Sequence, residues 1–131
     1  MIATVVLYNY WRWYPRGKLV FVVPTRPLAV QQEQACQRVT DIPQSDMCVM
    51  IGSSYTPDKR RAIYATKRLI FATPQIIDAD FKSGTLNPAD VVCLVVDEAH
   101  KATGDYAYVN LARGSSCCHC CCEFDGSLLF L

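Results

Sequence analysis

Short apolar segments alternate with amphipathic segments along most of this chain. Four of the apolar segments contain no alternating polar positions, and they span Leu19–Val23, Met47–Ile51, Leu69–Ala72 and Val91–Val96. A strand that is apolar on both sides is buried on both faces of its sheet, which is typical of parallel sheets. The pattern therefore predicts four buried, parallel strands.

The segments before and between the strands carry the signals of helices. Three of them place a proline at the start of the helix, and a threonine directly precedes two of these prolines, Pro57 and Pro74. The predicted helices span residues 3–14, 27–39, 57–66 and 74–81. Strands that alternate with helices predict an α/β fold, with a mostly parallel sheet and helices on both faces.

The composition is that of one globular domain. The 131 residues are 51% hydrophobic and 19% charged, which excludes a disordered chain. No apolar run approaches the roughly 20 residues of a membrane span, so we expect no membrane partner. The first residues include no basic segment, and Trp11, Arg12 and Trp13 interrupt the apolar stretch, which argues against a signal peptide.

The net charge of +1 hides a difference between the two halves of the chain. Residues 1–70 carry ten basic and four acidic side chains, whereas residues 71–131 carry three basic and eight acidic ones. One half is suited to face an anion and the other to hold a cation.

A basic stretch lies around the third strand, and we interpret it as a solvated helix face rather than a surface for non-specific DNA binding; it contains Lys59, Arg60, Arg61, Lys67 and Arg68.

Open α/β sheets bind ligands at the carboxyl ends of their strands, so the residues that follow each strand are the first candidates for a site. All four segments are polar or form turns, and they are Pro24-Thr25-Arg26, Gly52-Ser53-Ser54, Thr73-Pro74-Gln75 and Asp97-Glu98-Ala99-His100. Only the last segment combines two acids with a histidine.

The position of Asp97 and Glu98, directly after a buried strand, is that of the Walker B acids of nucleotide hydrolases. An aspartate there holds Mg²⁺, usually through water, and the neighbouring glutamate can act as the general base for the attacking water. His100 is placed to sense the γ-phosphate. The competing interpretation is a capped loop that merely follows a strand.

Four segments resemble the motifs of superfamily 2 helicases of the DEAH-box type. VVCLVVDEAHKATGDYAYVN (91–110) resembles motif II, FVVPTRPLAVQQ (21–32) motif Ia and FATPQIIDADFKSG (71–84) the motif Ib region. VVLYNYWRWYPRGK (5–18) is similar to the helix after the phosphate-binding loop. Together they resemble the Fanconi anaemia group M family of DNA translocases and its archaeal relative Hef.

This resemblance covers about residues 2–110 and implies a partial RecA-like (P-loop NTPase) domain. It implies an ATP-dependent DNA helicase or translocase that acts on branched or forked DNA in DNA repair, in the nucleus. ATP and Mg²⁺ are the implied cofactors, with Asp97 and Glu98 in the nucleotide site, and repair-complex proteins are implied partners.

The resemblance also implies sequence-independent contacts with DNA. Thr25 and Arg26 would contact the phosphates of one strand, and Thr73 and Pro74 would present a helix N-terminus to another phosphate. Gln75 would help to position that loop. The competing interpretation of each threonine is an ordinary helix cap.

One expected motif is missing, since the sequence contains no G-x-x-x-x-G-K-[ST] loop. Gly17-Lys18 precedes a strand, and Leu19 stands where serine or threonine is required. We therefore expect a fragment of the first motor domain with negligible ATPase activity by itself. Because the strand that carries this loop normally lies inside the sheet, its absence is expected to leave a sheet edge exposed.

Residues 111–131 form a cysteine-rich tail that lies outside the resemblance, and we expect it to be non-homologous, from an intron, a shifted frame or a mispredicted gene end. Its cluster has Cys-x-x-Cys spacing, but a structural zinc site normally uses two separated pairs of ligands, so zinc at Cys117–Cys122 is not favoured. Cys36, Cys48 and Cys93 stand alone in apolar segments, as reduced buried thiols do.

Two other functions fit the same layout. One is a superfamily 2 RNA helicase of the innate-sensor or Dicer type, against which the sequence around Tyr106–Tyr108 argues. The other is a truncated, non-catalytic remnant that binds nucleic acid.

An aromatic cluster in the first helix can stack on bases, but we favour a core role for it; its members are Tyr10, Trp11, Trp13 and Tyr14.

Overall fold

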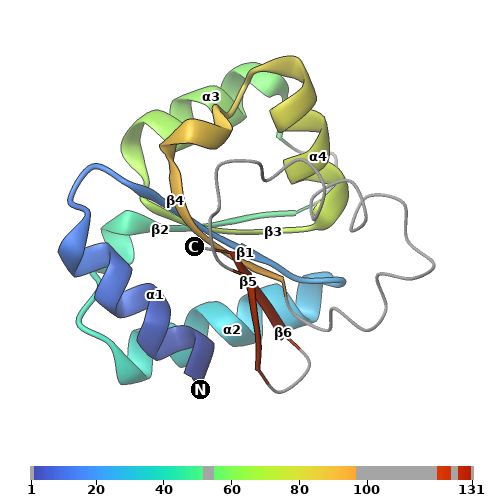
Figure 1. Ribbon diagram of the computed structural model, residues 1–131. Helices are drawn as coiled ribbons and strands as arrows, with labels where there is room; N and C mark the ends of the chain where they lie inside the picture. Colours follow the sequence, from blue (N-terminus) through green and yellow to red (C-terminus); the bar gives the residue numbers. More distant parts are fainter. Residues whose placement is uncertain (1, 52–54, 97–120, 125–126, 131) are drawn as a thin grey trace.

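The computed structural model describes residues 2–51, 55–96, 121–124 and 127–130, which form an α/β structure with helices on both sides of one sheet (Figure 1). The elements are α1 (Ile2–Trp13), β1 (Lys18–Val22), α2 (Arg26–Val39), β2 (Met47–Met50), α3 (Pro57–Thr66), β3 (Leu69–Ala72), α4 (Pro74–Ser83), β4 (Val91–Val96), β5 (Cys121–Phe124) and β6 (Ser127–Phe130). The four predicted strands and four predicted helices are confirmed, with ends that differ by at most two residues.

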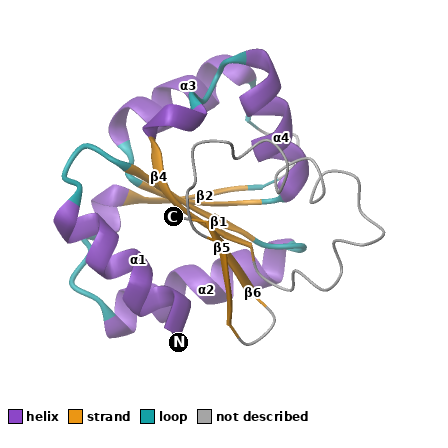
Figure 2. Cartoon of the chain, in the orientation of Figure 1, coloured by secondary structure: helices purple, strands orange, loops and turns teal. Residues whose placement is uncertain are grey.

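The sheet has the order β2-β3-β1-β4-β6-β5. Figure 2 shows its strands in orange and the helices in purple. The first four strands are parallel, whereas β6 runs antiparallel to β4, and β5 antiparallel to β6. Within the parallel part, Val22 at the end of β1 pairs with Ala72 of β3 on one side and Val96 of β4 on the other. The predicted α/β fold with a mostly parallel sheet is therefore confirmed.

Strand β1 explains why the apolar segments lack alternation. Leu19 and Phe21 pack into the core beneath α1 and α2, together with Leu7 of α1. Val20 and Val22 point to the opposite face, beneath α3 and α4, where Ile77 of α4 packs. All of these side chains are at most 2% exposed, so both faces of the strand require apolar residues.

A buried ionic cluster joins α3 to α4. The Asp80 carboxylate is fully buried and accepts hydrogen bonds from Arg60 Nε at 2.9 Å and 3.0 Å and from Arg60 Nη2 at 2.8 Å. The Tyr64 hydroxyl donates to the same carboxylate at 2.6 Å. Every polar group that Asp80 brings into the core is thus paired, as a buried charge requires.

The interpretation of the basic stretch as a solvated face is wrong for two of its members. Arg60 pairs with Asp80, and Arg68 Nη2 donates to the carbonyl oxygens of Trp11 at 2.8 Å and Tyr14 at 2.6 Å. The local sequence does not reveal these contacts, because the partners of the two arginines lie 20 to 57 positions away in the chain.

The edge of β4 that faces away from β1 is covered along part of its length. Leu94, Val95 and Val96 of β4 pair with residues 128–130 of β6 in an antiparallel ladder. The tail shows no clear strand period in its sequence, yet residues 121–130 supply two strands that extend the sheet. A strand edge with unpaired N–H and C=O groups is thereby covered along half of β4.

The aromatic cluster divides into two pairs with different surroundings. Tyr10 and Trp11 are partly buried against the core, as expected. Trp13 and Tyr14 are 64% and 48% exposed, so a core role is wrong for them. Trp13 is the last residue of α1 and Tyr14 directly follows it.

Two further predictions concern membranes and thiols. No helix in the described ranges is long and apolar enough to cross a bilayer. Cys36 and Cys93 are buried free thiols and Cys48 is half-buried, which agrees with reduced core cysteines. Cys117–Cys120 lie outside the described residues, so the absence of zinc from the cysteine cluster stays a prediction from the sequence.

Candidate nucleic-acid interface

The loops after β1 and β3 begin at adjacent points of one sheet edge. Val22 pairs with Ala72, and the backbone N–H of Val23 donates to the carbonyl oxygen of Ala72 at 3.0 Å. Since the two strands are parallel, both chains leave the sheet in the same direction. The fold thus brings the segment that begins with Thr25 next to the segment that begins with Thr73, although 48 positions separate them in the sequence.

Thr25 precedes α2 in an extended conformation, with φ −137° and ψ 157°. Its carbonyl oxygen accepts the first helical hydrogen bond, from Ala29 N at 3.2 Å, but its hydroxyl caps no backbone N–H. Both Thr25 and Arg26 are exposed, and Arg26 forms no ion pair with any residue that the structure describes. The hydroxyl and the guanidinium are therefore available to an external group.

Thr73 has the same arrangement before α4, with φ −78° and ψ 156°. Its carbonyl oxygen accepts from Ile77 N at 3.4 Å, and again the hydroxyl caps no backbone N–H. Pro74 is buried and begins the helix, which fixes the direction of α4, while Gln75 is exposed at the surface of this edge. Residues 73–75 thus combine a rigid helix start with a partly exposed threonine and an exposed glutamine.

Thr56 provides an internal comparison, because it also precedes a proline at the start of a helix. The Thr56 hydroxyl accepts a hydrogen bond from Lys59 N at 3.3 Å, which is ordinary N-capping. The capping interpretation is therefore confirmed for Thr56. At Thr25 and Thr73 the helices begin as predicted, but their hydroxyls do not cap.

The charges in the first turns of the helices show the same distinction. α3 carries Asp58 in its first turn, whereas α2 and α4 carry no acidic residue there. The partial positive charge at a helix N-terminus attracts anions, and an acidic side chain in the first turn neutralises part of it. The N-termini of α2 and α4 are therefore the more favourable places for a phosphate.

β4 is the first part of the segment that resembles motif II, and it ends beside these loops. Val96, its last residue, pairs with Val22 of β1, so β4 ends one strand away from the start of the Thr25 loop. Asp97, Glu98 and His100 themselves lie outside the described residues. Among the residues that are described, no group of three or more histidine, cysteine or acidic side chains is placed to hold a metal ion.

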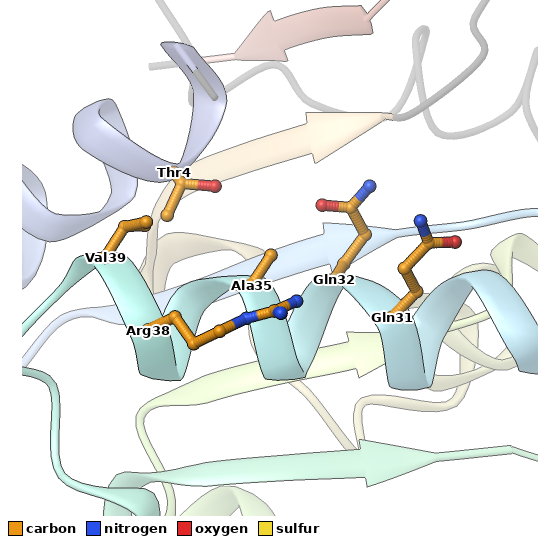
Figure 3. A pocket seen from close by; sticks show the side chains of 6 residues that line it. All are labelled: Thr4, Gln31, Gln32, Ala35, Arg38 and Val39. Atoms are coloured by element: carbon orange, nitrogen blue, oxygen red, sulfur yellow. The ribbon is translucent and has the colours of Figure 1, made fainter.

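A groove between α1 and α2 was not anticipated from the sequence (Figure 3). It has a volume of about 360 Å³ and is lined by Thr4, Gln31, Gln32, Ala35, Arg38 and Val39. Gln31 and Gln32 lie next to each other on α2 in Figure 3, and this consecutive pair was the one sequence signal for the groove. Its side chains offer hydrogen bonds but no acid or base for catalysis at neutral pH.

Comparison with known proteins agrees with the resemblance seen in the sequence. The family model for DEAD/DEAH box helicases matches residues 1–119. ATP-dependent DNA helicase MPH1 of Saccharomyces cerevisiae is 47% identical over 112 residues, which cover 86% of this chain and 11% of that protein. The Fanconi anemia group M protein homolog of Mus musculus is 49% identical over 112 residues, covering 86% of this chain and 6% of that protein.

A plant relative carries a different description. The DEAD-box ATP-dependent RNA helicase FANCM of Arabidopsis thaliana is 46% identical over 113 residues, covering 86% of this chain and 8% of that protein. The chain therefore spans 6% to 11% of the length of these three curated relatives. Among solved structures, the helicase domain of Pyrococcus furiosus Hef superposes with a TM-score of 0.76 at 34% identity, covering 87% of this chain and 24% of that one.

Proposed function

This chain belongs to the DEAD/DEAH box helicase family, and from that membership we propose that it forms part of the first motor domain of an ATP-dependent DNA helicase or translocase. The observation that carries the proposal is the contrast among the three Thr-Pro or Thr-x-Pro helix starts. Thr56 caps its helix, whereas the hydroxyls of Thr25 and Thr73, whose loops begin at adjacent points of one sheet edge, cap no backbone N–H.

In this proposal the sheet edge binds the DNA backbone. Arg26 supplies a full positive charge, and the N-termini of α2 and α4 supply partial positive charges and backbone N–H groups. Thr25 and Thr73 donate hydroxyl hydrogen bonds to phosphate oxygens, while Gln75 positions the second loop. Phosphate contacts carry no sequence information, so binding follows the shape of the DNA.

The nucleotide site is assigned to the segment after β4. We propose that Asp97 holds Mg²⁺, usually through water, that Glu98 is the general base and that His100 couples the nucleotide state to the DNA edge. When bound with ATP, Mg²⁺ neutralises charge on the β- and γ-phosphates. Support comes from the place of these residues in the sequence, directly after Val96, which itself pairs with Val22 at the start of the Thr25 loop.

The finer assignments rest on the relatives. Fungal and mouse relatives are described as an ATP-dependent DNA helicase and a Fanconi anemia group M protein homolog. From these we propose branched or forked DNA as substrate, a role in DNA repair with repair proteins as partners, and a nuclear location. The name of the Arabidopsis relative supports RNA as the alternative substrate. The absent G-x-x-x-x-G-K-[ST] motif supports a second alternative, binding without ATP turnover by these 131 residues.

The test is binding of fluorescein-labelled forked DNA, measured by anisotropy over a range of salt concentrations. Arg26→Ala removes one phosphate contact, so we expect weaker binding and a decrease of about 1 in the slope of log K against log salt. Thr56→Ala is the control for the other two threonines, because its hydroxyl already accepts a hydrogen bond from Lys59 N and its loss costs about 1 kcal/mol of stability.

The paired variant Thr25→Ala with Thr73→Ala is expected to weaken binding further without changing the salt slope, because hydroxyl groups carry no charge. Unchanged affinity and slope in Arg26→Ala would contradict the proposed interface. Competition with double-stranded RNA decides between the two substrates: RNA that displaces the fork at equal concentration favours the RNA helicase alternative.

A further inference from the structure

The end of α1 presents aromatic rings to solvent at the edge of the sheet opposite to Thr25 and Thr73. Trp13 is 64% exposed and Tyr14 is 48% exposed. Both pack on Tyr10, with ring centroids 5.5 Å apart in each case; the Tyr10 and Tyr14 rings are nearly parallel at 21°, and Tyr10 and Trp13 are tilted at 58°. Trp13 is the last residue of α1, and the loop that follows this helix leads into β1 (Figure 1).

The backbone beneath these rings is held by several contacts. Arg68, which precedes β3, donates from Nη2 to the carbonyl oxygens of Trp11 and Tyr14, and its guanidinium lies 5.2 Å from the centre of the Trp11 ring. The indole N–H of Trp11 donates to Asp46 at 3.0 Å. The exposed rings are therefore positioned before any ligand binds, which lowers the entropic cost of stacking on them.

A shallow apolar cavity of about 340 Å³ adjoins the rings. It is lined by Trp13, Tyr14, Pro15, Arg16, Gly17 and Val92. Gly17 is required here because a Cβ at this position would lie 2.6 Å from both Cγ atoms of Val92. The floor of the cavity is thus a closely packed backbone, and one of its walls carries a positive charge.

The charge at this end of the molecule suits a polyanion. Arg12 and Arg16 are exposed and form no ion pair with any residue in the described ranges, although Arg12 lies 5.7 Å from the centre of the Tyr8 ring. Basic side chains outnumber acidic ones where the strands begin: Arg12, Arg16, Lys18, Lys67 and Arg68 against Asp41, Asp46 and Asp90.

We propose that this aromatic surface, formed by Trp13, Tyr14, Pro15 and Arg16, binds single-stranded DNA. Bases stack on the rings of Trp13 and Tyr14, and Arg12 and Arg16 contact the flanking phosphates. Exposed aromatic rings flanked by arginines without an acidic partner in the described ranges form a combination that binds single strands without sequence preference. This surface is separate from the proposed backbone-binding edge, which lies at the carboxyl ends of the strands.

The test uses the 131-residue chain and a fluorescein-labelled oligothymidine of about 20 nucleotides, a length that spans a typical single-strand site. We expect the oligomer to quench tryptophan fluorescence, and we expect Trp13→Ala to lose most of that quenching and about tenfold in affinity by anisotropy, as the loss of one base–aromatic stack predicts. Trp13→Phe is expected to recover most of the affinity, because a phenyl ring still stacks.

Two controls distinguish a loss of base stacking from a general effect of substitution in α1 and from binding at the Thr25 and Thr73 loops. Val5→Ala alters a residue of α1 that is 52% exposed and lies far from the cavity, and it is expected to bind like the parent protein. Blunt duplex DNA hides its bases, so Trp13→Ala is expected to leave duplex binding unchanged, whereas Arg26→Ala weakens it. Circular dichroism of each variant verifies folding.

Three results would overturn this proposal. The first is parental affinity for oligothymidine in Trp13→Ala. The second is an equal loss for blunt duplex and for single strand, which would indicate a general effect of the substitution. The third is quenching by polyglutamate as strong as that by oligothymidine, which would assign the surface to an acidic protein segment instead.

Discussion

Replacement of Asp80 by alanine is expected to be among the most damaging single substitutions in this chain. The Asp80 carboxylate is fully buried and accepts three hydrogen bonds from Arg60 and one from Tyr64. The variant leaves the Arg60 guanidinium, whose side chain is 15% exposed, without its counter-ion, and the Tyr64 hydroxyl without its acceptor.

The expected cost follows from these two consequences. Removing one partner of a buried ion pair costs about 3–5 kcal/mol, and a buried hydroxyl without an acceptor costs roughly 1–3 kcal/mol. Because the two groups share one carboxylate, the costs overlap, and we expect about 4 kcal/mol in total. A single domain has only about 5–15 kcal/mol of stability, so the variant is expected to be largely unfolded under mild stress.

Urea denaturation followed by circular dichroism measures this difference. Asp78→Ala is the matched control on the same helix, since Asp78 forms an i,i+4 pair with Lys82 at 2.9 Å whose lysine is 63% exposed. Such a pair contributes about 0.3–0.5 kcal/mol. The double variant Arg60→Met with Asp80→Leu removes both charges, and we expect it to recover part of the loss.

An Asp80→Ala cost below about 1 kcal/mol would refute this account of the cluster. A double variant no more stable than Asp80→Ala would show that the unpaired guanidinium is not the source of the cost. The result also bears on the proposed DNA edge, because Asp80 ties α4 to α3, and α4 is the helix that begins at Pro74.

Three further predictions concern packing, pH and the sheet edge. Gly17→Ala is expected to lower the free energy of unfolding by about 1–3 kcal/mol through overpacking against Val92. Adding Val92→Ala should recover part of this loss in the same urea assay. Equal stability of Gly17→Ala and the parent protein would contradict the close approach of Gly17 to Val92. Burial raises the pKa of the Cys36 thiol from 9.0 to about 11, with partial opposition from its hydrogen bond to Thr4. The folded state therefore binds a proton that the unfolded chain releases, so this contribution is complete below pH 9 and is lost as pH rises through about 11. The fall in melting temperature over that interval should be smaller in Cys36→Ala, and an identical fall in both proteins would exclude the thiol as its source. Deletion of residues 121–131 exposes the edge of β4 and is expected to cause self-association, visible by size exclusion with light scattering; a deletion variant that stays as monodisperse as the full chain would show that β6 does not protect this edge.

Much of the fold was predictable because it depends on local patterns. The limits of β3 and β4 agree with the predicted strands residue for residue, since a strand buried on both faces must be apolar throughout. The starts of α3 and α4 were equally clear, because threonine and proline restrict the backbone at a helix N-terminus wherever they occur. The motif segments identified the family by the same route, since their residues are contiguous in the chain.

The roles of individual polar side chains depended on partners that are distant in the sequence. Thr25, Thr56 and Thr73 each precede a helix with a proline at its start, yet of these three hydroxyls only that of Thr56 caps its helix. The sequence predicts solvated side chains for Arg60 and Arg68. In the structure Arg60 pairs with Asp80, and Arg68 donates to the carbonyl oxygen of Trp11 in α1. A charged side chain looks the same in sequence whether water or a buried carboxylate surrounds it.

The α/β class, the four parallel strands and membership of a helicase family follow from local patterns of residues along the chain. Only the tertiary structure placed the Thr25 and Thr73 loops at adjacent points of one edge, exposed Trp13 and Tyr14 at the other, and covered β4 with β6. The physical reason is that burial patterns and backbone restrictions act over a few residues, whereas strand order and side-chain pairing are decided by contacts between segments far apart in the chain.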